Sequence, residues 1–146
     1  MKRCFFLALV VCVPFLGADK QVCPWMNAAT AAGILDGAVE MTVAGAPACE
    51  FVRQKPPAYA LRIEVSTGVV AADKCGSRPT VLKAIGNEAM ACADEGKDGQ
   101  RIERVVGRVR DQHFIIRIST GDRSITEESL IEKARRAAEQ VTGNLY

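Results

Sequence analysis

The sequence has little of what common enzyme sites are built from. It holds a single histidine, His113, and no cysteine pair with CxxC spacing, so the usual kinds of zinc site are excluded. It contains no Gly-x-Ser-x-Gly motif, the turn that presents a serine nucleophile in many hydrolases. Gly96 and Gly99 lie in an acidic turn and not between a strand and a helix, so a phosphate-binding loop is not expected either. We therefore expect no metal, no cofactor and no catalytic residue.

An excess of charge of one sign is also missing. The chain has 19 basic and 17 acidic side chains, and Lys2 and Arg3 at its start account for the difference. The remaining charges balance, and a balanced surface gives no reason to expect nucleic acid or an anionic membrane as a partner. After Leu16 no apolar run approaches the length that spans a bilayer. We expect no nucleic-acid partner and no stable membrane insertion after residue 18.

The first 18 residues have the layout of a secretory signal peptide. A short positive start is followed by an almost continuous apolar run from Cys4 to Leu16, and small residues then precede Asp19. This layout predicts a signal peptide over residues 1–18, cut after Ala18, and a single exported domain over residues 19–146. An uncleaved membrane anchor is the weaker alternative, because the apolar run is short for a span. The predicted location is periplasmic or secreted.

Four cysteines remain after the signal: Cys23, Cys49, Cys75 and Cys92. Export would place them where disulfides persist. Four cysteines allow three pairings. We favour Cys23–Cys49 and Cys75–Cys92, because each pair would join a short helix to a neighbouring strand; the other two pairings stay open.

Alternating apolar residues predict an α+β fold with an antiparallel sheet of five or six strands. The expected strands cover residues 39–43, 49–52, 59–65, 89–93, 102–109 and 113–119. Leu61, Ile63 and Val65 share one face of their strand, and Phe114, Ile116 and Ile118 share one face of theirs. We expect these faces to form the core.

Three helices are expected around the sheet. Asn27 is a good N-cap for a short helix ending near Gly37, and Pro79 favours a second short helix over residues 80–85. A long amphipathic helix over about 126–142 should pack on one face of the sheet, with Ser124 and Glu127 spaced as a capping box. Its apolar stripe is Leu130, Ala134, Ala138 and Val141.

Several residues that could carry chemistry have a plainer structural explanation. The carboxylate pairs Asp94-Glu95 and Glu127-Glu128 lie in a turn and at a helix start, where they solvate the turn and complement the helix dipole. His113 lies at a hairpin end and is expected to face solvent. Trp25 follows Cys23 closely and is expected to pack over the disulfide or the core.

Three short motifs occur in a consistent order along the chain: Cys23-Pro24-Trp25-Met26-Asn27, Ala48-Cys49-Glu50-Phe51 and Ala84-Ile85-Gly86-Asn87-Glu88-Ala89. With the last hairpin and the terminal helix, this order resembles small bacterial extracytoplasmic domains of unknown function. Those domains occur as secreted proteins or lipoproteins and are similar to some receptor-kinase sensor domains. The resemblance implies a fold and an exported location. This chain departs from the lipoprotein members because it has no lipidation cysteine.

These observations predict a non-enzymatic binding, sensing or accessory domain for an unidentified protein or small molecule of the cell envelope. The alternative is a cryptic periplasmic hydrolase with a site of dispersed Asp, Glu, Arg and Ser residues. If there is a binding face, strand alternation places it opposite the long helix. The expected members of that face are Arg104, Arg108, His113, Ile115 and Arg117. Such a cationic set would suit an acidic partner.

Overall fold

The computed structural model describes residues 22–43, 45–67, 75 and 79–146, and its described part is an α+β fold. The elements follow one another as α1 (Ala28–Ile34), β1 (Glu40–Val43), β2 (Ala48–Arg53), β3 (Tyr59–Thr67), β4 (Thr80–Val81), β5 (Glu88–Glu95), the 3-10 turn η1 (Lys97–Gly99), β6 (Arg101–Val109), β7 (Gln112–Thr120) and α2 (Glu127–Gly143). The signal peptide predicted over residues 1–18 lies outside the described residues. No helix in the described ranges is both long and apolar enough to cross a membrane.

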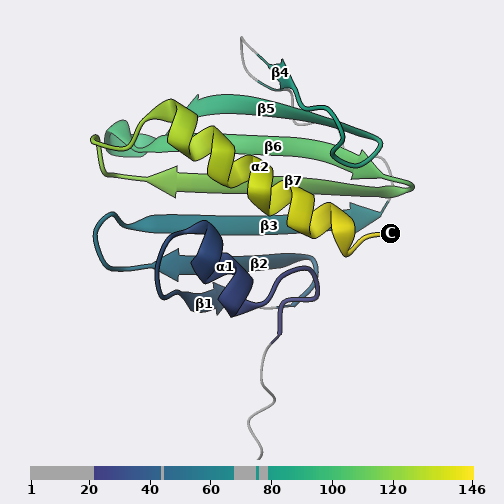
Figure 1. Ribbon diagram of the computed structural model, residues 1–146, viewed down its shortest axis with the longest axis horizontal. Coiled ribbons are helices and arrows are strands. Elements are labelled where there is room, and N and C mark those ends of the chain that lie inside the picture. Colours follow the sequence, from purple (N-terminus) through teal and green to yellow (C-terminus); the bar gives the residue numbers. More distant parts are fainter. Residues whose placement is uncertain (1–21, 44, 68–74, 76–78) are drawn as a thin grey trace, which may run out of the picture.

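The described strands form one antiparallel sheet in the order β1-β2-β3-β7-β6-β5-β4 (Figure 1). Its centre is the pairing of β3 with β7, in which Ile63 lies opposite Ile116. The sheet has seven strands and not the expected five or six. The additional strand is β4, which pairs Val81 with Met90.

The prediction of a helix over residues 80–85 is therefore wrong. Its first two residues extend the sheet, and the backbone N–H of Leu82 still donates to the Ala89 carbonyl at 2.9 Å. The chain then turns through left-handed conformations at Ala84 (φ 63°) and Gly86 (φ 59°). A left-handed residue so close to Pro79 leaves no room for even two helical turns.

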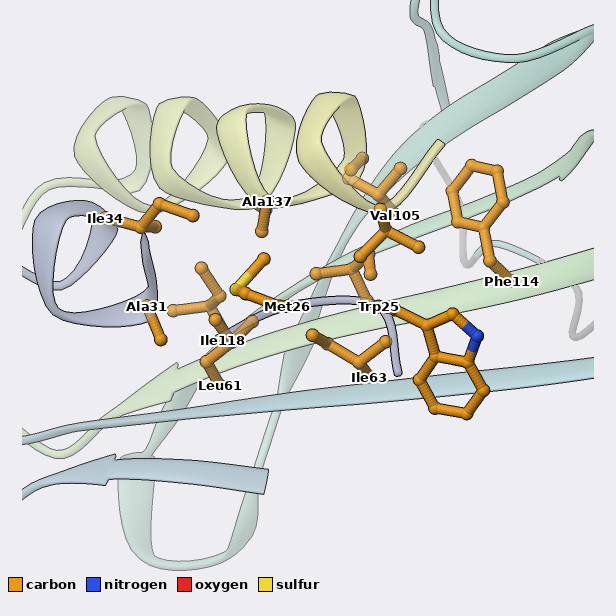
Figure 2. Packing of buried hydrophobic residues seen from close by; sticks show 14 of the residues in the cluster. Trp25, Met26, Ala31, Ile34, Leu61, Ile63, Val105, Phe114, Ile118 and Ala137 are labelled. Atoms are coloured by element: carbon orange, nitrogen blue, oxygen red, sulfur yellow. The ribbon is translucent and has the colours of Figure 1, made fainter. Parts of the chain in front are cut away.

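Both helices lie on the same face of the sheet, which we call the helix face (Figure 1). Every residue of the predicted core is buried between this face and the helices. Trp25, Met26 and Ala31 from the N-terminal segment and Ala137 from α2 complete the packing (Figure 2). The apolar faces of β3 and β7 thus pack against the apolar stripe of α2, as expected.

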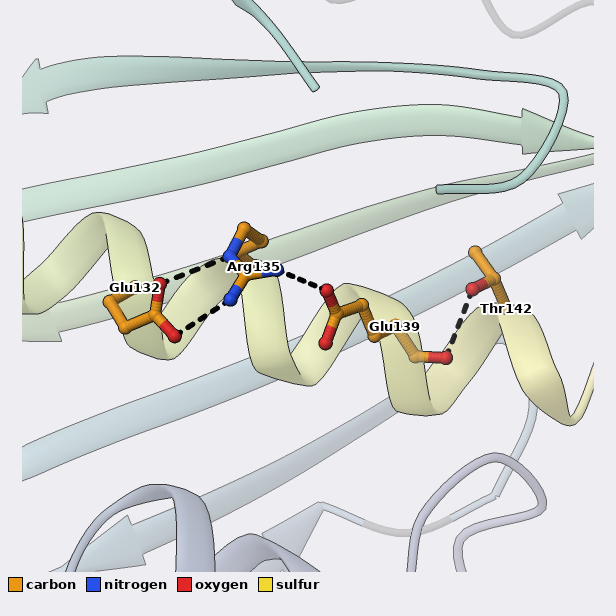
Figure 3. Close-up of polar contacts among 4 residues, drawn as sticks. All are labelled: Glu132, Arg135, Glu139 and Thr142. Atoms are coloured by element: carbon orange, nitrogen blue, oxygen red, sulfur yellow. Dashed lines mark hydrogen bonds and ion pairs between the residues drawn. The ribbon is translucent and has the colours of Figure 1, made fainter. Parts of the chain in front are cut away.

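The long helix begins one residue later than predicted and has a different cap. The Thr126 side chain is the N-cap and accepts a hydrogen bond from the Ser129 N–H at 3.2 Å, whereas Ser124 bonds to Asp122. On the outer surface of the helix, Arg135 lies between Glu132 and Glu139 and forms ion pairs with both (Figure 3). The capping-box expectation is therefore corrected, while the helix itself is confirmed.

The cysteines form the two predicted pairs. Cys23 is bonded to Cys49 with a Cα–Cα distance of 5.7 Å, and Cys75 to Cys92 with 5.3 Å. The first bond joins the segment before α1 to β2 on the helix face. The second lies on the other face, because Cys92 alternates with the buried Ala91 along β5. Disulfides of this kind are typical of oxidising compartments outside the cytoplasm.

Candidate functional site

The five residues expected to form a binding face do lie together on the side of the sheet opposite α2. The strand register places Arg104 beside Arg117 and Arg108 beside His113, with Ile115 beside Val106 between these pairs. No described helix covers this side, which we call the opposite face. Its central residues are Glu88, Met90, Cys92, Arg104, Val106, Arg108, His113, Ile115, Arg117, Arg62 and Glu64.

The cations of the opposite face are largely balanced. Arg104 is only 7% exposed, and its Nε lies 3.2 Å from the Asp94 carboxylate. Arg108 pairs with Glu88 at 2.9 Å and also donates to the Arg110 carbonyl. Arg117 is exposed and forms no ion pair with any residue that the structure describes. The expected cationic set is thus one exposed arginine among paired neighbours, which weakens the case for an acidic partner.

The opposite face contains an apolar row that the sequence analysis did not identify. Met90, Val106 and Ile115 lie side by side on β5, β6 and β7. They line a pocket of about 550 Å³, which is within the size range of small-molecule sites. The residues on the neighbouring segment 81–89 complete its wall, and its polar side chains are Lys83, Asn87, Glu88 and His113. His113 is half-buried and lines this pocket, whereas it was expected to face solvent.

The wall of the pocket is held by contacts to the last hairpin. Ile85 is buried in the core, and the Asn87 N–H donates to the Arg108 carbonyl at 2.8 Å. The Asn87 side chain in turn accepts a hydrogen bond from the Arg110 N–H at 2.6 Å. These contacts fix the turn after β4 against the β6–β7 hairpin, so the pocket is formed before any ligand binds.

Gly107 determines how closely the strands approach at this pocket. A Cβ at position 107 would lie 2.4 Å from Cζ of Phe114 and 2.6 Å from the Glu88 carbonyl oxygen. The ring of Phe114 therefore lies where a side chain of residue 107 would be. Any larger residue at position 107 would displace the ring or the start of β5.

A second cavity, of about 560 Å³, lies at the start of α2 on the helix face. It is lined by Asp94, Glu95, Glu103 and Glu127 among others. Glu103 is 2% exposed, and its burial, together with the charges of Glu127 and Asp94, raises its pKa to about 7. Members of both carboxylate pairs, which were expected only to solvate a turn and complement a helix dipole, thus line one cavity around Glu103, an acid that the sequence analysis did not single out.

Comparison of the chain with family models, curated proteins and solved structures gives no significant match.

Proposed function

We propose that this chain is an exported, non-enzymatic binding domain that holds an apolar ligand of the cell envelope in the pocket on the opposite face. The observation that carries the proposal is the row of Met90, Val106 and Ile115, which lines a pocket of about 550 Å³. Apolar pockets with a few polar groups at their edge are the usual form of small-molecule sites. Apolar side chains in such a pocket favour a ligand, or a partner side chain, of the same character.

The polar groups of the pocket are few, and they orient the ligand at one end. Glu88 is already paired with Arg108, so its carboxylate is not free to hold a cation. Lys83 and His113 lie among the lining residues and suit a ligand with one polar or acidic end. The proposed ligand is therefore an amphipathic small molecule with a dominant apolar part.

The exported location is supported by the disulfides and by the layout of residues 1–18. The order of the cysteine and glycine motifs, which resembles that of small bacterial extracytoplasmic domains, points the same way. Cleavage after Ala18 would release a periplasmic or secreted protein with Asp19 as its first residue. N-terminal sequencing of the protein recovered from the envelope or the medium tests this, and an intact Met1 in the recovered protein would contradict it.

The binding proposal is tested with the uncharged fluorophore N-phenyl-1-naphthylamine, which brightens in apolar sites. The variant Met90→Glu places a carboxylate in the pocket and should weaken binding at least tenfold, since desolvating a charge costs more than about 1.4 kcal/mol. Val43→Glu is a matched control, because Val43 and Met90 are both 37% exposed but only Met90 lines the pocket. Equal binding by the two variants, or no binding by the unmodified chain, would refute the proposal.

The hydrolase alternative has one observation in its favour, the buried Glu103. A carboxyl with a pKa of about 7 is suited to general acid–base catalysis near neutral pH. Among the described residues that line its cavity, the one hydroxyl is that of Thr126, which caps α2 by accepting a hydrogen bond from the Ser129 N–H. The described residues therefore place no free hydroxyl nucleophile beside Glu103, and we favour binding as the function.

A further inference from the structure

Glu103 is a buried acid to which the described part of the chain offers no partner. It lies on β6 between Ala93 of β5 and Ile118 of β7, and its side chain points to the helix face beside the first turn of α2. Its side chain is 2% exposed, and no described residue donates a hydrogen bond to it or forms an ion pair with it. Buried carboxylates are normally paired, because an unpaired charge away from water is costly. The position of Glu103 therefore calls for a group that balances it.

The cavity beside Glu103 is large enough to admit such a group. Its volume is about 560 Å³, and Ala93, which lies opposite Glu103 in the register, is exposed, so the cavity opens to solvent. Leu130 supplies an apolar wall from α2. The site therefore combines a buried acid with space and an apolar surface.

The charges around Glu103 are mostly negative. From β5 it is faced by Asp94 and Glu95, from α2 by Glu127 and from β6 by Arg101, while β7 contributes only the uncharged Ile118 and Thr120. Asp94 is paired with Arg104, and the Arg101 guanidinium donates to the Ile125 carbonyl. Glu95, Glu103 and Glu127 form no ion pair with any described residue, and they outnumber Arg101, the one lining cation whose charge is not paired. The lining therefore keeps a net negative charge, and the cavity attracts positive charge.

We propose that this cavity binds a small organic cation, an amine or an amidinium or guanidinium group, whose charge is balanced by Glu103. A metal ion fits less well, because no three His, Cys, Asp or Glu side chains of the described ranges lie close enough together to hold one. An organic cation needs only one buried counter-charge and gains further from contact with Leu130. The site is separate from the pocket on the opposite face, so neither proposal depends on the other.

Binding should depend on pH, because only ionised Glu103 balances a cation. Burial first, then the charges of Glu127 and Asp94, raise the pKa of this acid to about 7. Below that pH the cation must displace the proton of Glu103 to bind. The affinity should therefore fall by about tenfold for each pH unit below 7 and change little above pH 8.

The test is a titration that monitors the backbone amide signals in nuclear magnetic resonance spectra. The probes are benzamidine, a flat cation, methylammonium, a smaller cation, and benzamide, the uncharged analogue of benzamidine. At pH 8 the cations should shift the signals of Glu103 and Thr126, and benzamide should not. Glu103→Gln should weaken cation binding at least tenfold. The control is Glu128→Gln, which removes an exposed carboxylate of the first turn of α2 that does not line the cavity. This variant should leave the affinity for the cations within twofold.

The proposal would be overturned by no shift with either cation, by equal binding to Glu103→Gln and the unmodified chain, or by equal shifts with benzamide. Amide signals that shift on the opposite face when a cation is added would overturn the proposal as well. Because Gln is nearly isosteric with Glu and uncharged, this variant is expected to fold. An unchanged amide spectrum away from residue 103 would verify that.

Discussion

Glu103 of β6 and Glu127 of α2 line the same cavity, and the charge of Glu127 contributes to the raised pKa of Glu103. Burial is the larger cause of the raised pKa. Glu103 lies under the first turn of α2, whereas Glu127 is exposed at the edge of the cavity. An acid whose pKa is higher in the folded than in the unfolded chain destabilises the fold wherever it is ionised. The fold therefore retains a group that lowers its stability at neutral pH, which is common at functional sites.

We expect Glu103→Gln to stabilise the protein at pH 8 but not at pH 4. The pKa of Glu103 is about 7 in the folded chain, against an ordinary value of 4.5. As pH rises from about 4.5 to 7 the unfolded chain loses its proton first, so the stability of the unmodified chain falls across this window and then levels off. Glutamine does not ionise, so the free energy of unfolding of the variant should exceed that of the unmodified chain by about 3 kcal/mol at pH 8. Urea unfolding at both pH values measures the gain, and an equal effect at pH 4 would contradict the assignment.

Gly107→Ala should destabilise the protein by about 1–3 kcal/mol. The added methyl would meet the Phe114 ring and the Glu88 carbonyl oxygen at less than 3 Å. Gly33→Ala is the control, since no atom lies within 4 Å of a Cβ there. Because Gly33 lies within α1, its replacement should stabilise by about 0.5–1 kcal/mol. Thermal unfolding of the two variants should give shifts of opposite sign, and shifts of the same sign would count against the close packing at Gly107.

Each disulfide should contribute about 3 kcal/mol to stability. The bonds close chain separations of 26 and 17 residues, for which the loss of unfolded-state entropy is similar. Cys23→Ala/Cys49→Ala and Cys75→Ala/Cys92→Ala should therefore both lower the urea midpoint. Peptide mapping without reductant should recover the two bonds as separate linked peptides. A linked peptide that joins Cys23 to Cys75 or Cys92 would refute the pairing.

Lys133 is a buried cation that ties α2 to the segment after α1. Its Nζ donates to the Ile34 carbonyl at 3.0 Å, pairs with Asp36 and lies 5.4 Å from the centre of the Tyr59 ring. Lys133→Met should cost about 1–3 kcal/mol, because a buried carbonyl loses its donor. Arg136→Met, an exposed cation of the same helix, should cost little. Equal costs for the two variants would show that the buried contacts of Lys133 do not matter.

The ion pair of Lys133 with Asp36 makes stability depend on pH with the opposite sign to that of Glu103. The hydrogen bond from Lys133 lowers the pKa of Asp36 below its ordinary value of 3.8. The stabilisation is therefore complete above pH 3.8 and is lost as pH falls through the lower pKa of the folded state. The cost of Lys133→Met should shrink in acid, and a cost that stays constant down to pH 2 would exclude a contribution from Asp36.

The sequence predicted the sheet well where alternation was regular and polar turns were clear. Along Leu61, Ile63 and Val65 every second residue is apolar, and the same holds from Phe114 to Ile118, so the buried face could be assigned in advance. The two cysteine pairs were predicted from expected neighbouring elements, and the Cys75–Cys92 pairing is right although the short helix that it was expected to flank does not form. The error at residues 80–85 arose because the pairing of Val81 with Met90 is a tertiary contact that local sequence does not show.

The sites were harder to predict because both depend on register between distant strands. Met90, Val106 and Ile115 are each unremarkable in the sequence, and they form a row only once β5, β6 and β7 align. Glu103 looked like one acid in a charged hairpin. Its alternation with Val105 was the available signal, since it places an acid on the buried face.

The central claim is that the pocket on the opposite face binds an apolar ligand, and a titration followed through side-chain methyl signals tests it most directly. We predict that N-phenyl-1-naphthylamine shifts the methyl signals of Met90, Val106 and Ile115 in the disulfide-bonded chain. Those of Val43 and Ile131, which do not line the pocket, should stay in place. Unmoved Met90, Val106 and Ile115 signals at saturating fluorophore, or shifts confined to other parts of the chain, would contradict the account.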